Sequence, residues 1–310
     1  MKTSALPINR PLTGLGSPVR SRWLDLVELT KPRIAVMVLF TVAVGALLAN
    51  PVSADLVQLV HALIGTALVA SGASALNQWL ERQSDAQMRR TENRPLPAGR
   101  LSPGEALGFG IALSVIGLVY MFLVMAHPLA GLVTAVTLLS YVFIYTPLKS
   151  KTTLNTLIGA VPGALPPVIG WTAMTGSLDK MAGVLFLIVF FWQVPHFLAI
   201  AWMYREDYAR AGLKMLPNVD AEGSATSRQM LLYALALVPV SLLPVYLHEA
   251  GGMYAFGALG LGLYFLRSVW RFALAPGQPQ ARKVLHASLV YLPGVLALLL
   301  VERLIRYWMV

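Results

Sequence analysis

Two carboxylates and one amide recur at intervals of four residues between two apolar stretches of the sequence. They are Asn77, Glu81 and Asp85, in the run NQWLERQSDAQMRRTENRPLPAGR that covers residues 77–100. Because side chains at positions i, i+4 and i+8 stack along one face of a helix, this spacing predicts that the three converge. Their oxygen atoms are the ligands that a hard cation such as Mg²⁺ prefers. The run therefore predicts a metal site at the end of an apolar helix.

A cluster of arginines follows these acids directly. Arg89, Arg90 and Arg94 come next in the same run. Guanidinium groups bind phosphate oxygens in charge-assisted pairs, and a metal held by the acids would bind the same phosphates. Acids on one turn and arginines on the next are typical of a site for a metal-bridged polyanion. The alternative is a solvated turn between two membrane helices, which the in-phase spacing of the acids disfavours.

A second group of acids followed by bases lies at the end of another apolar segment. Glu206 and Asp207 come first, and Arg210 and Lys214 follow. Chance could place one acidic helix end beside the membrane. Two helix ends with the same order of acids and bases, on the same predicted face of the membrane, favour a joint site.

One histidine, His196, lies about two turns inside the end of that second apolar segment. A lone histidine on an apolar helix is more often a hydrogen-bonded core residue than a ligand. Histidine within a membrane is nevertheless rare and costly, which also favours a functional role. The residue types alone leave both interpretations open.

The composition indicates a polytopic membrane protein. Of the 310 residues, 57% are hydrophobic and only 12% are charged, about half of the roughly 25% that a soluble domain carries. The absence of cysteine excludes disulfides, thiolate metal sites and a cysteine nucleophile. The net charge of +10 would suit a nucleic-acid partner, but the position of the basic residues in the loops argues against nucleic acid and for membrane orientation.

The sequence predicts an all-α fold of nine transmembrane helices bundled around a central cavity. With the N-terminus in the cytoplasm, 21 of the 24 basic residues fall on the cytoplasmic side, which agrees with the positive-inside rule. Residues 1–30 are predicted to form a basic cytoplasmic tail and residues 31–310 the membrane domain, with cytoplasmic active-site loops at 77–104 and 204–228. Apolar segments of membrane-spanning length cover residues 33–50, 56–76, 105–126, 129–147, 154–175, 182–203, 229–248, 252–272 and 285–305.

These motifs resemble those of the UbiA-type intramembrane prenyltransferases. The spacing of Asn77, Glu81 and Asp85 is similar to the first aspartate-rich motif of that superfamily. The likeness spans nearly the whole chain beyond residue 30, and four blocks are similar to the branch that farnesylates heme. Two positions depart from the pattern: Glu81 stands where the superfamily usually has Asp, and Ala211 stands four residues after Asp207. The blocks are RTENRPLPAGRLS (90–102), YTPLKSKTTLNTLIGAVPGALPPVIGW (145–171), WQVPHFLAIAW (192–202) and REDYARAGLKMLP (205–217).

The resemblance implies that farnesyl diphosphate and heme B react to give heme O and diphosphate, for the assembly of respiratory heme–copper oxidases. It implies that His196 binds heme, and that the enzyme lies in the bilayer of a bacterial inner membrane, with heme A synthase or a terminal oxidase as partner. The implied cofactor is Mg²⁺, whose ligands would be Asn77, Glu81, Asp85, Glu206 and Asp207. The implied catalytic residues are Asn77, Glu81, Asp85 and Asp207, and the implied diphosphate-binding residues are Arg89, Arg94, Lys149, Arg210 and Lys214.

Two other functions are compatible with parts of the pattern. One is a prenyltransferase that acts on a quinone precursor or another aromatic acceptor, which the Pro-His-Phe block at 195–197 and the Glu-Asp-Tyr block at 206–208 disfavour. The other is a secondary transporter, which broken helices and paired acids can also indicate. Transporter sites tend to lie near the midplane of the membrane, whereas these acids lie at helix ends beside arginines.

Overall fold

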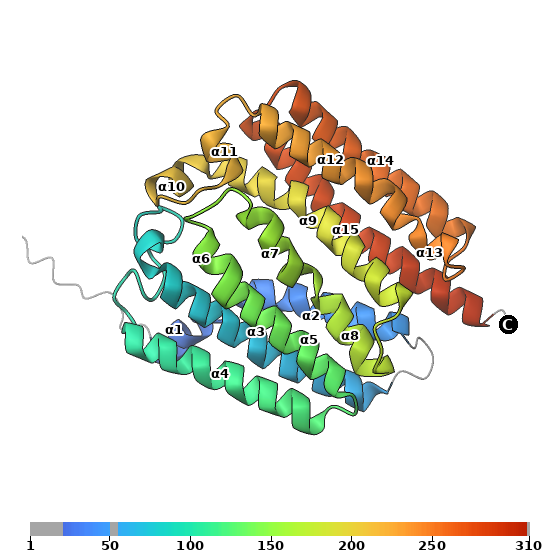
Figure 1. Ribbon diagram of the computed structural model, residues 1–310, viewed down its shortest axis with the longest axis horizontal. Coiled ribbons are helices and arrows are strands. Elements are labelled where there is room, and N and C mark those ends of the chain that lie inside the picture. The colour runs from blue at the N-terminus through green and yellow to red at the C-terminus, as the bar shows by residue number, and fades with distance from the viewer. Residues whose placement is uncertain (1–20, 50–54, 309–310) are drawn as a thin grey trace, which may run out of the picture.

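The computed structural model describes residues 21–49 and 55–308, and this part of the chain folds into helices and turns without any strand. The helices run side by side along one bundle (Figure 1). They are α1 (Arg22–Leu29), α2 (Pro32–Ala49), α3 (Leu56–Asp85), α4 (Pro103–Val124), α5 (Pro128–Leu139), the π-helix η1 (Ser140–Tyr145), α6 (Thr146–Leu148), α7 (Asn155–Ala164), α8 (Pro166–Thr175), α9 (Lys180–Met203), α10 (Arg205–Arg210), α11 (Leu216–Val219), α12 (Ser224–Ser241), α13 (Leu243–Tyr246), α14 (Gly252–Leu274) and α15 (Gln278–Trp308).

Within this part of the chain, eight helical stretches are long and apolar enough to cross a membrane. The predicted segment at 252–272 is not among the eight, although it forms the 23-residue helix α14. Several glycines and Arg267 lower its apolar character, but its length of about 35 Å would still cross a bilayer core. The protein is therefore an all-helical, multi-pass membrane protein. The ninth crossing, the central cavity and the cytoplasmic N-terminus stay predictions.

The last part of the predicted tail forms helix α1, while residues 1–20 lie outside the described residues. Asp25 and Leu29 of α1 are buried. Arg100, in the loop after α3, binds Asp25 at 2.7 Å and Glu28 at 2.8 Å, and Gln78 of α3 donates to the carbonyl of Leu29 at 2.8 Å. Helix α1 is therefore held against the loop that carries the predicted active-site arginines.

Helix α3 is longer than its apolar segment predicts. It begins after Asp55, whose carboxylate caps the first turn, and runs for 30 residues to Asp85, beyond the apolar segment at 56–76. The predicted helical spacing of Asn77, Glu81 and Asp85 is confirmed, because all three lie on this one helix.

Glycines set the closest contacts between the helices. A Cβ at Gly45 would lie 2.0 Å from the backbone oxygen of Pro167, and one at Gly170 would lie 1.9 Å from that of Val42. Helices α2 and α8 therefore touch backbone to backbone, as small residues allow in membrane bundles. Prolines break the fifth predicted segment as expected, since α7 ends at Ala164 and α8 begins at Pro166.

A prediction follows for the crossing of α2 and α8. The change Gly170→Ala adds a methyl group where the Val42 carbonyl leaves no space. This overpacking should lower the free energy of unfolding by about 1–3 kcal/mol. The matched control is Gly183→Ala in α9, where an added Cβ meets no atom within 4 Å. Because alanine favours a helix over glycine by up to about 1 kcal/mol, the control should keep or raise the melting temperature. Thermal unfolding of both purified variants checks this, and equal melting temperatures would contradict the tight crossing.

Candidate active site

The end of α3 meets the segment η1–α6 in a group of charged and polar side chains that we call the inner ionic cluster: Lys31, Asn77, Glu81, Asp85, Arg94 and Lys149. Asn77 is 1% exposed and donates through Nδ2 to the Thr146 hydroxyl at 3.1 Å. Its Oδ1 accepts from Lys31 Nζ at 2.9 Å. Since a lysine only donates, this contact fixes the orientation of the amide.

Each acid of α3 is paired with a base from another segment of the chain. Glu81 lies 2.6 Å from Lys149 Nζ, and Asp85 lies 2.7 Å from a terminal nitrogen of Arg94. Lys149 follows α6, so it reaches Glu81 from a helix that the sequence places far away. The structure thus brings together Asn77, Glu81, Asp85 and two of the predicted diphosphate-binding residues, Arg94 and Lys149.

The π-helix η1 positions the side of the cluster opposite α3. Thr146 donates its hydroxyl to the carbonyl of Tyr141, five residues earlier, at 2.9 Å. Lys149 Nζ lies 4.7 Å from the centre of the Tyr145 ring. A Cβ at Gly159 would clash with that ring at 2.4 Å. The absence of a side chain at Gly159 therefore leaves the space that the Tyr145 ring occupies. Such π-helical turns occur often at functional sites.

The inner ionic cluster has three cations and only two carboxylates. Burial alone would lower the pKa of Lys149, but the adjacent Glu81 carboxylate acts together with Tyr145 and Tyr141 and raises that pKa well above its ordinary value. Asp85 is 1% exposed, and its Oδ1 is buried without a hydrogen-bonding partner while Oδ2 binds Arg94. A free carboxylate oxygen beside an amide and a second carboxylate is a donor set that fits Mg²⁺. The surplus of cations fits an anion of several charges.

Lys31 is a member of the cluster that the sequence analysis missed. Its backbone is left-handed, with φ of 51°, which is uncommon for a residue other than glycine. Burial, and then the charge of Arg94, lower the pKa of Lys31 to about 7. The sequence showed this lysine only as one more basic residue beside a membrane segment, because its partner Asn77 lies 46 positions away.

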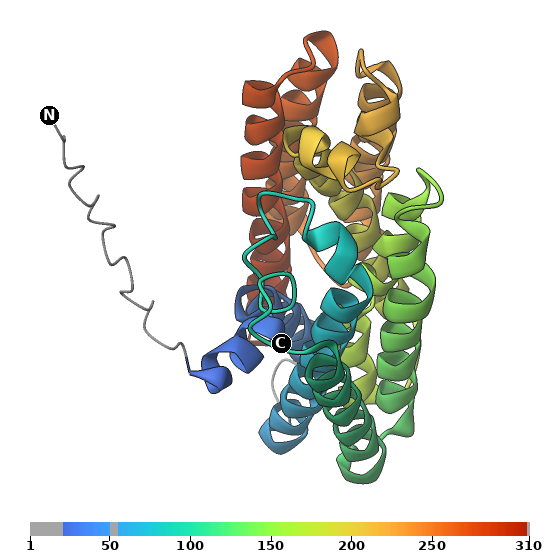
Figure 2. The same ribbon diagram turned by 90° about the vertical axis from the view of Figure 1, so that its left-hand side faces the viewer.

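The second predicted motif lies against the first. Arg90, in the loop after α3, lies 4.7 Å and 5.4 Å from the ring centres of Tyr204 and Tyr208 and donates to the Tyr208 hydroxyl at 3.0 Å. The backbone amide of Lys214 donates to the carbonyl of Lys149 at 2.8 Å. Figure 1 places the loop after α3, α10 and α11 at one end of the bundle, and Figure 2 views the molecule from that side.

The structure does not bring every predicted residue into direct contact with the inner ionic cluster. Asp207 pairs with Arg210 of its own helix. Arg89, Glu206 and the side chain of Lys214 are exposed. Within residues 21–49 and 55–308, no three His, Asp or Glu side chains stand where they could hold a metal together. Glu81, Asp85 and Asp207 all bind basic side chains instead.

His196 lies away from this cluster, in the interior of α9. Its Nδ1 is 2.7 Å from the hydroxyl of Ser288 on α15, and its ring stacks on Trp192 with centroids 4.9 Å apart. The Ser288 hydroxyl also lies 2.7 Å from the carbonyl of Leu285. When it donates to that carbonyl, Ser288 Oγ accepts from His196 Nδ1–H. In that tautomer His196 Nε2, which has no protein partner within the described part of the chain, keeps its lone pair.

The features of this chain define first its class of protein and then its family. A buried cluster of acids and bases at one end of an apolar helical bundle has the charges that an anionic substrate in a membrane would need. The pattern of the UbiA prenyltransferase family matches residues 38–291, and the chain belongs to that family. It is similar to two proteins named protoheme IX farnesyltransferase. One, from Solibacter usitatus, is 49% identical over 90% of this chain and 98% of its own length; the other, from Koribacter versatilis, is 42% identical over 98% and 100%.

Solved structures share the fold at low sequence identity. A digeranylgeranylglyceryl phosphate synthase matches with a TM-score of 0.77 at 18% identity, over 91% of this chain and 98% of its own. A UbiA homologue from Archaeoglobus fulgidus, bound to GPP and Mg²⁺, matches with a TM-score of 0.58 at 14% identity, over 89% and 99%. These likenesses confirm the predicted fold class, and the family makes the chain a prenyltransferase.

A prediction concerns Lys31 and its pKa of about 7. Lys31 is charged below this pH and neutral above it, and a diphosphate beside it would raise the pKa again. Binding should therefore take up a proton near pH 8, and affinity should fall as pH rises above about 7. Removing the charge with Lys31→Met should weaken binding about 10- to 100-fold, as for a charge-assisted hydrogen bond.

Calorimetric titration of farnesyl diphosphate in buffers of different ionisation enthalpy measures this proton uptake. The control is Lys151→Met, since Lys151 is exposed on the same predicted side of the membrane. Equal proton uptake by the wild-type protein and Lys31→Met would show that Lys31 does not face the diphosphate.

Proposed function

We propose that this prenyltransferase transfers the farnesyl group of farnesyl diphosphate to a vinyl group of heme B, giving heme O and diphosphate. The observation that carries the proposal is the similarity to proteins named protoheme IX farnesyltransferase, at 42–49% identity over 90% or more of this chain. The pairs Glu81–Lys149 and Asp85–Arg94 supply the charges that a metal-bound diphosphate needs.

An exchange of partners explains why acids and bases lie paired at this site. Asn77, Glu81 and Asp85 would hold Mg²⁺ through oxygen, with Asp207 and Glu206 reaching it from α10. Lys31, Arg94 and Lys149 would then turn to the diphosphate oxygens, with Arg89, Arg210 and Lys214 completing the clamp. Bound Mg²⁺ would neutralise negative charge on the leaving diphosphate.

The basic residues act on the step that breaks the allylic C–O bond. The bond electrons leave with the diphosphate, and Arg94 and Lys149 stabilise this growing charge in a site of low dielectric. The farnesyl carbocation then bonds to the terminal vinyl carbon of heme. Water adds to the neighbouring carbon and loses a proton, which gives the hydroxyl group. The apolar bundle excludes water from the first cation until the carbon–carbon bond has formed.

His196 would bind the iron of the acceptor heme. In the tautomer whose Nδ1 proton Ser288 accepts, Nε2 is the nitrogen with a free lone pair, and an imidazole ligates iron through such a lone pair. The Trp192 indole donates to the Ser288 carbonyl at 2.7 Å, which holds this arrangement between α9 and α15. Ser288 is thus a positioning residue for His196.

The proposal extends to the cellular setting. The apolar helices place the enzyme in a bilayer, and the relatives from bacteria favour a bacterial inner membrane. The product would pass to a heme A synthase or directly to a terminal oxidase. Acceptors of the quinone-precursor type remain the second candidate, because the UbiA family pattern does not itself name the acceptor.

The acceptor can be tested directly in membranes that contain the protein. Membranes are incubated with Mg²⁺ and farnesyl diphosphate, and with heme B or an aromatic acid as acceptor. Extracted products are then identified by mass. Heme that carries one added farnesyl group and one added hydroxyl group supports the proposal. Prenylation of the aromatic acid alone would assign the quinone-precursor reaction, and no prenylated product would contradict both.

A prediction concerns Asp85 and Asp207, which are 122 positions apart in the chain. If they flank one metal–diphosphate, Asp85→Asn and Asp207→Asn should each lower heme O formation by about 10²–10³-fold. The double variant should lose far less than the product of the two, since residues that act as a unit are not additive. Raising Mg²⁺ should partly restore the single variants. Near-normal activity of Asp207→Asn would leave α3 to hold the diphosphate alone.

Another prediction concerns the pair His196–Ser288. Ser288→Ala removes the acceptor for Nδ1–H, so heme affinity should fall about 10- to 100-fold, as for other residues that orient a ligand. Ser288→Thr keeps a hydroxyl and should retain affinity. His196→Ala should shift the Soret band of bound heme, and added imidazole should restore it. An unchanged spectrum in His196→Ala would show that His196 is a core residue without contact to iron.

A further inference from the structure

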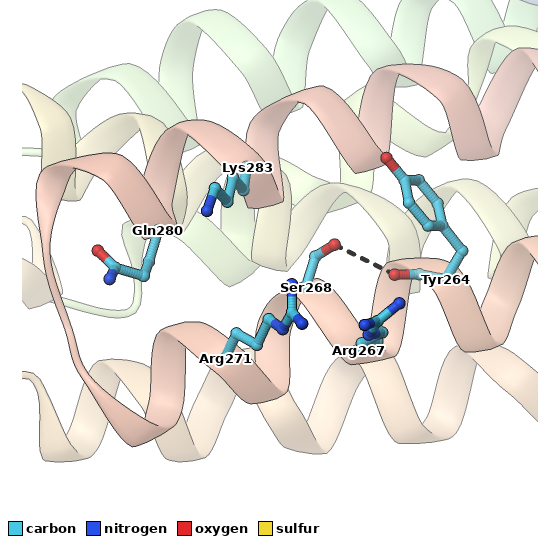
Figure 3. Close-up of a pocket in the computed structure, with 6 residues that line it drawn as sticks. All are labelled: Tyr264, Arg267, Ser268, Arg271, Gln280 and Lys283. Atoms are coloured by element: carbon cyan, nitrogen blue, oxygen red, sulfur yellow. Dashed lines mark hydrogen bonds between the residues drawn. The ribbon is translucent and has the colours of Figure 1, made fainter.

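A second group of basic side chains lies in a cleft between α14 and α15, away from the inner ionic cluster. The cleft is small, with a volume of about 60 Å³. Figure 3 shows its side chains gathered in the space between the two helices. The lining residues are Tyr264, Arg267, Ser268 and Arg271 from α14, and Gln280 and Lys283 from α15.

The cations of this cleft have no acidic partner. Within the described part of the chain, the side chains of Arg267, Arg271 and Lys283 make no ion pair and no hydrogen bond. The sequence from 251 to 301 contains no Asp or Glu at all. Like charges four residues apart, such as Arg267 and Arg271, destabilise a helix. The three side chains are exposed, and the protein places no acid beside them, so their charges are open to an anion from outside the protein.

The cleft has groups that suit phosphate oxygens. Two guanidinium groups and one ammonium group donate charge-assisted hydrogen bonds to phosphate. The side-chain amide of Gln280 can donate as well. Ser268 donates its hydroxyl to the carbonyl of Tyr264 at 3.1 Å. The donors available to a phosphate are therefore the guanidinium, ammonium and amide groups. Within the cleft, no carboxylate would repel an anion.

Apolar side chains beside the cleft indicate that the phosphate belongs to a lipid. Leu263, Trp270 and Leu274 of α14 are 51%, 56% and 71% exposed, as expected for side chains that face acyl chains. Trp270 lies between Arg267 and Arg271 in sequence, and tryptophans gather where the membrane meets water. The cleft lies at the same end of the bundle as the active site, because Gln278 of α15 donates to the carbonyl of Met203 at the end of α9.

We propose that this cleft is a phosphate-binding site for the head group of an anionic phospholipid. Basic pockets between membrane helices on the cytoplasmic side bind such head groups. The positive-inside rule would explain why basic residues lie at this end of the bundle. It does not require that three of them line the same cleft. Arg228 and Arg282 satisfy that rule and lie outside the cleft.

The test uses the purified full-length protein and two double variants. Arg267→Gln/Arg271→Gln removes two charges from the cleft, and Arg228→Gln/Arg282→Gln removes two exposed charges outside it. Native mass spectrometry measures binding of phosphatidylglycerol and phosphatidylcholine. The cleft variant should bind phosphatidylglycerol about thirtyfold more weakly, since each basic side chain contributes about fivefold. The control variant should bind phosphatidylglycerol as tightly as the wild-type protein does. Both variants should bind phosphatidylcholine with unchanged affinity.

Farnesyl diphosphate binding, measured in parallel, shows that each variant is folded, and it does not depend on the cleft. Equal loss of phosphatidylglycerol in both double variants would overturn the proposal, since charge alone would then explain binding. Displacement of the lipid by inorganic phosphate would assign the cleft to a soluble phosphate and overturn the lipid assignment. If the protein did not farnesylate heme, the lipid-binding measurement would still test the cleft, because the cleft shares no residue with the candidate active site.

Discussion

The pairing of Glu81 with Lys149 is the contact on which the rest of the site depends. An ionised carboxylate at the edge of a bilayer is costly unless a base lies beside it, and Lys149 is 2.6 Å away. To make this contact, α3 must continue two turns beyond its apolar segment. The π-helical turn η1 must also direct the following segment, which carries Lys149, toward α3. The positions of Asn77, Thr146 and Tyr145 follow from these two requirements.

In the proposed function, the same pairing would make the site responsive to its substrate. A diphosphate with a metal would bring positive charge for the acids and negative charge for the bases, so both could exchange partners without exposing a buried charge. Asp85 already has one free carboxylate oxygen, and Lys31 is poorly stabilised as a cation. Arg90 ties the loop after α3 to Tyr204 and Tyr208. This contact would keep Asp207 close enough to join when a substrate arrives.

The sequence predicted those parts of the protein that depend on local patterns. Apolar length predicted the helices, and the interval of four placed Asn77, Glu81 and Asp85 on one helix. Contacts between distant segments left no local pattern. Nothing near Lys31 indicates that it meets Asn77, and nothing near Ser288 indicates that it forms a hydrogen bond with His196. For the end of α3, the spacing of these three residues was the better guide, because apolar content stops at Leu76 while helical hydrogen bonding continues to Asp85.

The two basic sites of this protein differ in one physical respect. In the inner ionic cluster every cation lies near an acid or an amide oxygen, so the site can be emptied and filled without a large change in buried charge. This suits a substrate that must arrive and a diphosphate that must leave. The cleft between α14 and α15 has cations and no acids, so the repulsion among them returns whenever its anion leaves. A lasting ligand such as a lipid head group fits the second arrangement, and a reacting one fits the first.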